Sequence, residues 1–433
     1  MEERGEVRNY SKLSILLVNN YFPPEIGAAS HLYYYLAKEL IARGHEVTVL
    51  TGIPRYNVSR EFYQDYLRKL KGKSMLEENY EGIKVVRVKL PYIERRNIIR
   101  RGVEHFEIAW KLYRNFAKLL DRGSYRVDVS LVYSPPLTLY WTAEKIRQKT
   151  GSPYVLNVQD LFPQAVIDLG IMRNKILIKF FRKLEKKAYE SADLIVTHSE
   201  RNRKFVASIV EDESKTLFIE NWVDAEEIIP GSKKNEFSEK YNLIDKFVVS
   251  FAGTLGFSQD MEVILRAAER LKNYKDIIFV IVGDGVRFEE IKKAILERKL
   301  ENVLLMGAVP KEKYPLILHS SNVSLVTLTK DVKTPVIPSK ILSIMSAGIP
   351  VVGAMNLDGD APELVKRAKA GFVVAAGDYE ALAQKILLLY RDEALRKELG
   401  RNGRRYIEEH LSAKKAAEKW ENIFYELLYK KGR

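Results

Sequence analysis

The stretch FVVSFAGTLGFSQDMEVILRAAERLKNYKDIIFVIVGDGVRFEE, residues 247–290, decides the fold. It holds two short apolar runs, FVVSFAG (247–253) and IIFVIVG (277–283), and each run leads through glycine into a segment of helical period. Short apolar runs rich in β-branched residues are typical of strands buried on both faces, and their alternation with helices is typical of a parallel sheet. The stretch therefore predicts two successive strand–helix units between residues 247 and 298.

The same alternation extends in both directions along the chain. We expect strands at 13–19, 46–51, 83–88, 128–133, 154–158 and 194–198, and again at 302–307, 322–328 and 349–353, with helices between them. A chain of 433 residues is long for one core, and residues 221–237 carry proline, glycine and a charge run typical of a linker. We predict two doubly wound α/β domains, 1–225 and 238–412. Residues 378–430 are predicted to be helical, and 54–82 to be a long loop with a short helix.

The composition excludes some classes of protein and leaves others open. The chain has no cysteine, which excludes disulfides, thiolate nucleophiles and cysteine-based zinc sites. We see no apolar run long enough to span a bilayer and no signal peptide, so we expect a cytoplasmic protein. The net charge of +14 favours a polyanionic partner. The basic stretches 95–122 and 173–187 fit either helices that contact an anionic membrane or solvated helix faces above the core.

Glycine-bearing turns follow three of the predicted strands. Gly27, Ala28 and Ala29 precede the first long helix; Gly253, Thr254 and Gly256 follow one strand of the second series, and Gly283 and Gly285 follow the next. Small residues let backbone N–H groups approach an anion at a helix start, although a tight turn without a ligand uses them too. Turns at neighbouring strand ends line the crevice where open α/β sheets bind ligands. The sequence thus predicts a ligand site at this edge.

Residues 335–352, PVIPSKILSIMSAGIPVV, supply a cation at the same edge. Pro338 and Ser339 are suited to start a helix, with Ser339 a favoured N-cap, and Lys340 then falls in the first turn. A cation there is unfavourable for the helix dipole unless an anion lies nearby, which favours a phosphate group. An exposed lysine without a ligand is the alternative. Downstream, Asp360 and Glu363 are candidate acceptors for sugar hydroxyls.

A single acidic residue stands out in the first half of the chain. Asp160, in NVQDLFPQ, follows a predicted strand and is placed to serve as a catalytic group on the acceptor side, or else as a helix N-cap. The histidines His31, His105 and His198 show no metal-ligand spacing with nearby carboxylates. We therefore expect no metal site.

Several motifs together resemble the retaining glycosyltransferases of family 4. They are NYFPPEIGAASHLYYYLAKELIARGHEVTVLT, NVQDLFPQ, FAGTLGFSQDMEVILRAAE, VGDGVR and IPSKILSIMSAGIPVVG, which occur in this order between residues 20 and 353. The branch that they resemble most contains the fucosyl- and acetamidofucosyl-type transferases of bacterial surface-polysaccharide assembly. The resemblance spans about residues 13–425.

This resemblance implies the GT-B fold, with two Rossmann-like domains facing each other across a cleft. The N-terminal domain is then expected to hold the acceptor and the C-terminal domain the nucleotide, with the helix at 413–430 packed back on the first domain. Transfer is expected to retain the anomeric configuration and to need neither metal nor cofactor. Catalysis comes from charge stabilisation on the departing diphosphate.

The chain departs from the pattern of the family at two places. The two glutamates that many members carry eight positions apart fall on Pro335 and Ser343, and the usual arginine and lysine are absent between Thr254 and Gln259. The resemblance then assigns the diphosphate to Lys340, helped by Arg287, and a ribose hydroxyl to Ser343. Gln259 and Val309 complete the expected donor-binding residues. These departures leave a weakly active relative as an alternative.

The function expected from all this is sugar transfer from a nucleoside diphosphate sugar, UDP before GDP, to a lipid-linked or glycan acceptor. The alternative enzyme hypothesis is a sugar-nucleotide epimerase with the GT-B fold. A nucleic-acid-binding protein would also explain the charge of +14, but it predicts aromatic residues interleaved with Lys and Arg on an exposed sheet, and we see no such module.

Overall fold

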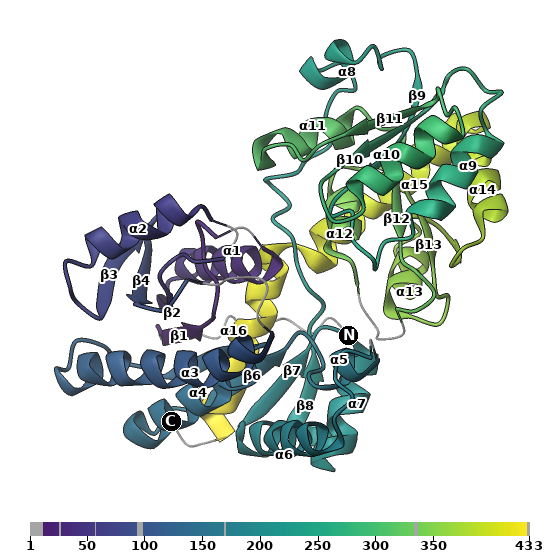
Figure 1. The fold of residues 1–433 in the computed structure, drawn as a ribbon. Coiled ribbons are helices and arrows are strands. Elements are labelled where there is room, and N and C mark those ends of the chain that lie inside the picture. Colours follow the sequence, from purple (N-terminus) through teal and green to yellow (C-terminus); the bar gives the residue numbers. More distant parts are fainter. Residues whose placement is uncertain are drawn as a thin grey trace, which may run out of the picture. The chain divides into compact units, whose positions relative to one another are not determined.

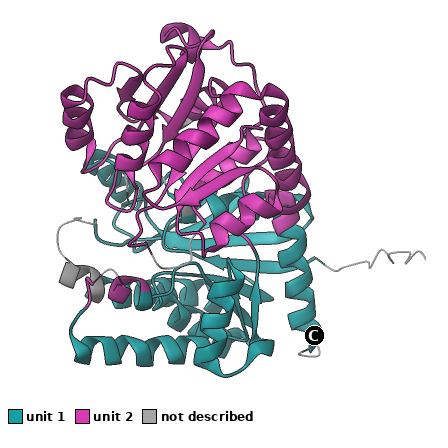
Figure 2. Cartoon of the chain, turned by 90° about the vertical axis from the view of Figure 1, so that its right-hand side faces the viewer, with its two compact units in different colours: residues 1–164, 173–219, 417–433 teal, residues 165–172, 220–416 magenta. Residues whose placement is uncertain are grey.

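The computed structural model describes residues 12–25, 27–56, 58–92, 98–168, 170–332 and 337–430. The chain forms two compact units (Figure 2). Unit 1 comprises residues 1–164, 173–219 and 417–433, and unit 2 comprises residues 165–172 and 220–416. The division therefore falls at 219/220 and again at 416/417, beside the boundaries of 1–225 and 238–412 proposed from the sequence.

Unit 1 is built on a sheet in the order β3-β4-β2-β1-β5-β6-β7-β8 (Figure 1). All neighbours are parallel except β3, which pairs antiparallel with β4. The strands are β1 (Ser14–Val18), β2 (Glu46–Gly52), β3 (Met75–Tyr80), β4 (Ile83–Val88), β5 (Val129–Ser134), β6 (Tyr154–Val158), β7 (Leu194–Thr197) and β8 (Thr216–Phe218).

The helices of unit 1 connect these strands. They are α1 (Ala28–Ala42), α2 (Arg60–Lys69), α3 (Ile98–Asp121), α4 (Leu139–Thr150), α6 (Lys175–Ser191), α7 (Glu200–Val210) and the short η1 (Glu213–Lys215), with α5 (Gln164–Asp168) at the boundary. A single core joins β1, β2, β4, β5 and β6 to the buried faces of α3, α4, α6 and α7. The alternation of apolar runs and helical periods predicted this parallel, layered arrangement.

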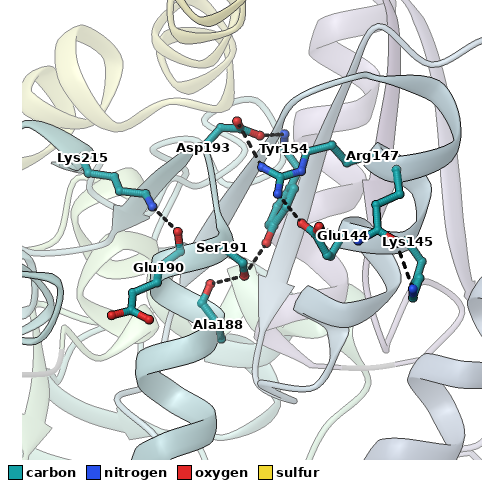
Figure 3. Close-up of polar contacts among 10 residues, drawn as sticks. Glu144, Lys145, Arg147, Tyr154, Ala188, Glu190, Ser191, Asp193 and Lys215 are labelled. Atoms are coloured by element: carbon teal, nitrogen blue, oxygen red, sulfur yellow. Dashed lines mark hydrogen bonds and ion pairs between the residues drawn. The ribbon is translucent and has the colours of Figure 1, made fainter.

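Polar contacts fix the amino end of β6 to its neighbours (Figure 3). Asp193, just before β7, accepts a hydrogen bond from the Tyr154 N–H at 2.9 Å and lies 3.3 Å from an Arg147 nitrogen. Arg147 also pairs with Glu144 at 2.6 Å, and the Tyr154 hydroxyl meets Ser191 at 2.9 Å. These contacts join α4, α6, β6 and β7 at the sheet edge opposite to the one that carries Asp160.

Unit 2 has a wholly parallel sheet in the order β11-β10-β9-β12-β13-β14. The strand order reverses between β9 and β12, which is the topological switch point of a doubly wound sheet. The strands are β9 (Phe247–Ala252), β10 (Ile277–Val282), β11 (Val303–Met306), β12 (Val323–Thr327), β13 (Val351–Met355) and β14 (Gly371–Ala375).

Successive residues of the unit 2 strands enter different cores, as expected for strands buried on both faces. Val249 of β9 packs with α9 and α14, whereas its neighbour Val248 packs with α8 and α11. The remaining core lies beneath α12 and α13. The helices are α8 (Glu236–Lys240), α9 (Met261–Arg270), α10 (Phe288–Glu297), η2 (Lys311–Lys313), α11 (Tyr314–His319), α12 (Ser339–Ser346), α13 (Asp360–Arg367), α14 (Tyr379–Arg391), α15 (Glu393–Tyr406) and η3 (Ile407–Leu411).

The expectation for residues 54–82 was wrong in one respect. The short helix exists as α2, but the segment also forms β3, the antiparallel edge strand of unit 1. The strands β8 and β14 were also missed. The helical tail is confirmed, because α14, α15, η3 and α16 (Ala413–Lys430) fill residues 379–430.

Helix α16 begins in unit 2 and continues into unit 1 from residue 417. Within unit 1 its Glu421 accepts a hydrogen bond from Arg43 Nε at 3.0 Å and lies 2.8 Å from His45 Nε2. The opposite ring nitrogen of His45 accepts from the Leu13 N–H at 3.2 Å. The last helix of the chain is therefore bonded to the segment between α1 and β2.

Candidate functional site

The glycine turns after β9 and β10 pack directly against each other beside the switch point of unit 2. A Cβ atom on Gly283 would lie 1.9 Å from the Gly253 carbonyl oxygen, and one on Gly285 would lie 2.5 Å from the Leu255 oxygen. The Leu255 N–H donates to the Asp284 carbonyl at 2.9 Å. Glycine is required because no side chain fits between the turns. The two glycine turns that the sequence predicted at neighbouring strand ends are thus in contact in the structure.

Lys340 reaches this pair of turns from α12. Its Nζ donates a hydrogen bond to Gln259 Oε1 at 2.8 Å and lies 4.0 Å from the centre of the Phe251 ring. A Cβ on Gly253 would lie 3.0 Å from the same nitrogen. Burial lowers the pKa of the Lys340 ammonium to about 7. The Lys340 side chain therefore places an ammonium group with a lowered pKa beside the half-buried Gly253, and an anionic ligand at this place would stabilise the charged form.

The start of α12 differs from the prediction in its cap. The N-cap residue is Pro338, and among the described residues no side chain caps the helix. Ser339 is the first helical residue and is exposed, so it is not the N-cap that we expected. Lys340 does fall in the first turn. Pro335 lies outside the described residues.

Ser343 lies one turn further along α12 and is half-buried. It forms a hydrogen bond with the hydroxyl of Tyr314, whose pKa burial raises to about 12. Tyr314 opens α11 and packs on the core beneath α12. The serine predicted to bind ribose is therefore held by a tyrosine that the sequence analysis did not single out.

The other predicted donor-binding residues lie around this centre at different distances along the sheet edge. Arg287 pairs with Glu290 at 2.6 Å, and its Nη1 donates to the Gln259 carbonyl at 3.4 Å, so it joins the same loop as Lys340. Thr254 is exposed and Gly256 half-buried in that loop. Val309, in the loop before α11, packs with the core of β10. Val309 is thus one strand further out than the glycine turns.

Helix α13 carries the predicted acidic residues. Asp360 is its first residue and Glu363 lies in its first turn, where the helix dipole stabilises a carboxylate. Glu363 is exposed, whereas Asp360 is half-buried. Both follow β13, the strand next to β12, at the carboxyl edge of the sheet.

In unit 1, the predicted residues also follow strands at the carboxyl edge. Gly27 is the N-cap of α1, and Ala28 and Ala29 begin that helix, although the side chain of Ala28 lies outside the described ones. Asp160 follows β6 and is exposed. No hydrogen bond or ion pair among the described residues joins Asp160 to the Gly27 turn.

A buried carboxylate shapes the loop that leads to Gly27, and the sequence analysis missed it. Glu25 accepts hydrogen bonds from the N–H groups of Arg55 and Tyr56 at 2.9 Å and from Phe22 at 3.1 Å. Burial raises the pKa of Glu25, against these hydrogen bonds. The Arg55 guanidinium in turn donates to Asn20 at 2.8 Å. Only the run PPEIG hinted at this, since a glutamate between proline and glycine is poorly placed for a solvated helix face.

Among the described residues, no three His, Asp or Glu side chains gather as a metal ion would need. The expectation that the protein needs no metal stays a prediction.

Two family models match the chain in succession. The "glycosyl transferase 4-like domain" matches residues 27–222, and "glycosyl transferases group 1" matches residues 233–406. The chain belongs to the group 1, family 4-like glycosyltransferases. The first model falls on most of unit 1 and the second on the glycine turns, Lys340 and α13 of unit 2.

Known proteins agree with this assignment. The probable glycosyltransferase WbjE of Pseudomonas aeruginosa is 27% identical over 300 residues, 69% of this chain and 74% of that protein. The putative colanic acid biosynthesis glycosyl transferase WcaI of Escherichia coli is 22% identical over 345 residues, 78% and 82% of the two chains. The crystal structure of Anabaena HepE in complex with UDP matches with a TM-score of 0.66 at 15% identity, over 96% of this chain and 100% of that one. This glycosyltransferase therefore has the GT-B fold expected from the sequence.

Proposed function

We propose that this glycosyltransferase transfers a sugar from a nucleoside diphosphate sugar, UDP before GDP, to a lipid-linked or glycan acceptor in the assembly of a surface polysaccharide. The observation that carries the proposal is the position of Lys340, whose Nζ lies 2.8 Å from Gln259 and against Gly253 at the switch point of unit 2. The UDP bound to HepE and the role in WcaI's name support the donor and the product class.

A contact within unit 2 supports each part of the proposed donor site. Gly283 and Gly285 let the two turns pack together, and Gly253 leaves no side chain between its backbone and the Lys340 Nζ, where the diphosphate is proposed to bind. Lys340 then offsets the negative charge that develops on the diphosphate as the sugar leaves, an interaction stronger in the transition state than in the bound donor. Ser343, positioned by Tyr314, is proposed to accept or donate a hydrogen bond with the ribose.

The proposed reaction retains the anomeric configuration and needs no metal or cofactor. The bond between the anomeric carbon and the diphosphate oxygen breaks, the acceptor hydroxyl bonds to the same face of that carbon, and its proton passes to the leaving diphosphate. Asp160 is proposed to contact the acceptor from unit 1. The stereochemistry is checked by following the anomeric proton of the first product by NMR.

A thermal-shift panel tests the donor site. UDP-, GDP-, ADP- and dTDP-sugars are each added to the wild type, to Lys340→Ala and to the control Lys272→Ala, an exposed lysine beyond the far end of α9. We expect UDP-sugars to raise the Tm of the wild type and of Lys272→Ala, and to raise that of Lys340→Ala much less. No shift with any nucleotide would overturn the donor proposal, and an equal shift in Lys340→Ala would overturn the role of Lys340.

A further inference from the structure

The first half of α6 exposes apolar side chains that a solvated helix would not carry. Ile176 is 82% exposed and Phe180 51%, and Leu177 beside them is also exposed. The fully buried residues of this helix all lie in its second half, from Glu185 onward. The first two turns of α6 thus present an apolar surface outward rather than to the core.

Helix α3 continues this surface. Phe106 and Trp110, one helical turn apart, are 43% and 46% exposed, whereas Ile108 and Leu112 on the opposite side are buried. The rings of Phe106 and Phe180 lie 6.4 Å apart, so the exposed residues of the two helices meet. Both helices pack on the same core of unit 1 (Figure 1). We call Phe106, Trp110, Ile176, Leu177 and Phe180 the aromatic surface.

Four lysines of α6 border the aromatic surface and have no carboxylate partner among the residues that the structure describes. Lys175, Lys179, Lys183 and Lys187 are all exposed on α6, and none makes an ion pair with a described residue. The first three lie within about two turns of Phe180, so they border the apolar residues directly. On α3, the Arg114 guanidinium lies over the Trp110 ring at 4.9 Å. An apolar centre with uncompensated cations at its edge is complementary to a layer of acyl chains beneath anionic headgroups.

We propose that α3 and α6 dock the enzyme on an anionic lipid bilayer through the aromatic surface. Aromatic and aliphatic side chains would enter the headgroup boundary while the lysines meet lipid phosphates. The inference extends the proposed function, since a lipid-linked acceptor is met at such a surface, but it depends on unit 1 residues alone.

Other occupants fit the charges less well. A second copy of the chain placed symmetrically on this face would bring the lysines of two α6 helices together without acidic partners. A nucleic acid would be attracted by the lysines but would leave Ile176, Leu177 and Phe180 without apolar contacts. No helix in the described part of the chain combines the length and the apolar composition that a bilayer span requires. The surface of α3 and α6 is thus the proposed means of attachment.

Vesicle sedimentation with the full chain tests the inference. Vesicles of phosphatidylcholine alone are compared with vesicles that also contain phosphatidylglycerol, at low and high salt. We expect binding to the anionic vesicles only, weakened by salt. Changing Lys175, Lys179, Lys183 and Lys187 to Gln should lower the partition coefficient more than about a hundredfold, at roughly fivefold per lysine. A second variant, Ile176→Ser with Phe180→Ser, should lower the partition coefficient by the same factor at low and at high salt.

A matched control separates local docking from net charge. Changing the exposed unit 2 lysines Lys272, Lys275, Lys292 and Lys366 to Gln removes the same charge and should leave vesicle binding within about threefold of the wild type. The thermal shift with a UDP-sugar should be unchanged in all three variants, which shows that they fold and keeps this test separate from the donor proposal.

Three results would overturn the inference. They are no binding of the wild type to anionic vesicles, an equal loss in the control variant, and tighter binding to duplex DNA than to vesicles at the same salt. Salt-independent self-association that is lost in the Ile176→Ser, Phe180→Ser variant would instead identify the surface as an interface between copies.

Discussion

The Lys340 ammonium and the Gln259 side chain are hydrogen-bonded over 2.8 Å although they lie 81 positions apart in the chain. The lysine comes from α12, and the glutamine from the loop between β9 and α9. In the family that the sequence resembles, this loop usually carries an arginine and a lysine, and both are absent here between Thr254 and Gln259. In this chain α12, which follows β12, brings the Lys340 cation to the loop. The first two predictions test how the contact between Lys340 and Gln259 affects donor binding.

A carboxylate at position 259 should compete with the donor. In Gln259→Glu the new charge would pair with Lys340 and repel a diphosphate at the same place. We expect the Kd for a UDP-sugar, measured by calorimetry, to rise roughly tenfold to a hundredfold, or about 1.4–2.8 kcal/mol. Gln259→Met, which removes the hydrogen bond without adding charge, should have a smaller effect. Unchanged affinity in Gln259→Glu would contradict the placement of the diphosphate beside Lys340.

The protonation of Lys340 should make donor binding depend on pH. Burial lowers its pKa to about 7 in the free protein, and a bound diphosphate favours the ammonium and raises this pKa. Binding should therefore take up protons at neutral and higher pH, and the affinity for a UDP-sugar should fall as the pH rises above about 7, by at most about tenfold per unit. A UDP-sugar is the right probe because its diphosphate has no proton that titrates in this range.

Calorimetry in buffers of different ionisation enthalpy measures the proton uptake directly. Lys340→Arg keeps the cation but does not titrate near neutrality, so its affinity should lose this pH dependence. An affinity that rises with pH in the wild type, or the same pH profile in Lys340→Arg, would show that another group titrates.

The strands buried on both faces could be predicted from the sequence. Of the four strands at the edges of the two sheets, only β11 was predicted, and β3, β8 and β14 were missed. Residues such as those of β9 and β10 form continuous apolar runs because both faces meet a core. In β3, MLEENY, no residue is fully buried and only Met75 and Leu76 are aliphatic, so no apolar run marks it. Its pairing with β4 depends on a partner strand that a local pattern does not reveal.

The residues of the candidate site also fall into those that a local sequence pattern predicts and those that it does not. Lys340 could be found because a cation in the first turn of a helix is locally unfavourable, and the glycines because each follows a strand. The bond from Tyr314 to Ser343 could not be predicted, because it joins α11 to α12 across the packed core. The Glu25 carboxylate was missed for a similar reason, since its three backbone donors include Arg55 and Tyr56 from a distant loop.

The contact between the two glycine turns should make Gly283 intolerant of any side chain. In Gly283→Ala the new Cβ would lie 1.9 Å from the Gly253 carbonyl oxygen, so the turns must separate. We expect the free energy of unfolding, from urea titration followed by circular dichroism, to fall by about 2–3 kcal/mol. Gly256→Ala in the same loop is the control, because its nearest neighbour would be Thr254 Cγ2 at 3.8 Å. Equal stability of the two variants would contradict the close packing of the turns.

The hydrogen bonds of Glu421 in α16 to Arg43 and His45 should contribute stability that depends on pH. Glu421 is buried, which raises its pKa, but hydrogen bonds from Arg43 and His45 outweigh this and hold the pKa below its usual value. A carboxyl group with a lowered pKa stabilises the folded state above the pKa of the unfolded chain, about 4.3, and this contribution is lost as the pH falls through the folded value. Glu421→Gln keeps the shape and removes the charge, so it should lower the free energy of unfolding at neutral pH by about 1–2 kcal/mol, since Arg43 remains partly solvated.

The control for this bond is Glu418→Gln, because Glu418 lies 4.0 Å from Arg43 in a more exposed position. It should change the free energy of unfolding by less than about 0.5 kcal/mol. Urea titrations at a series of pH values distinguish the two carboxylates: the difference between the wild type and Glu421→Gln should be largest at neutral pH and close as the pH falls below about 4. A difference that is constant across this range would mean that the glutamate acts through its packing and not through its charge. In that case the attachment of α16 would rest on its apolar face, in which Trp420 and Phe424 are fully buried.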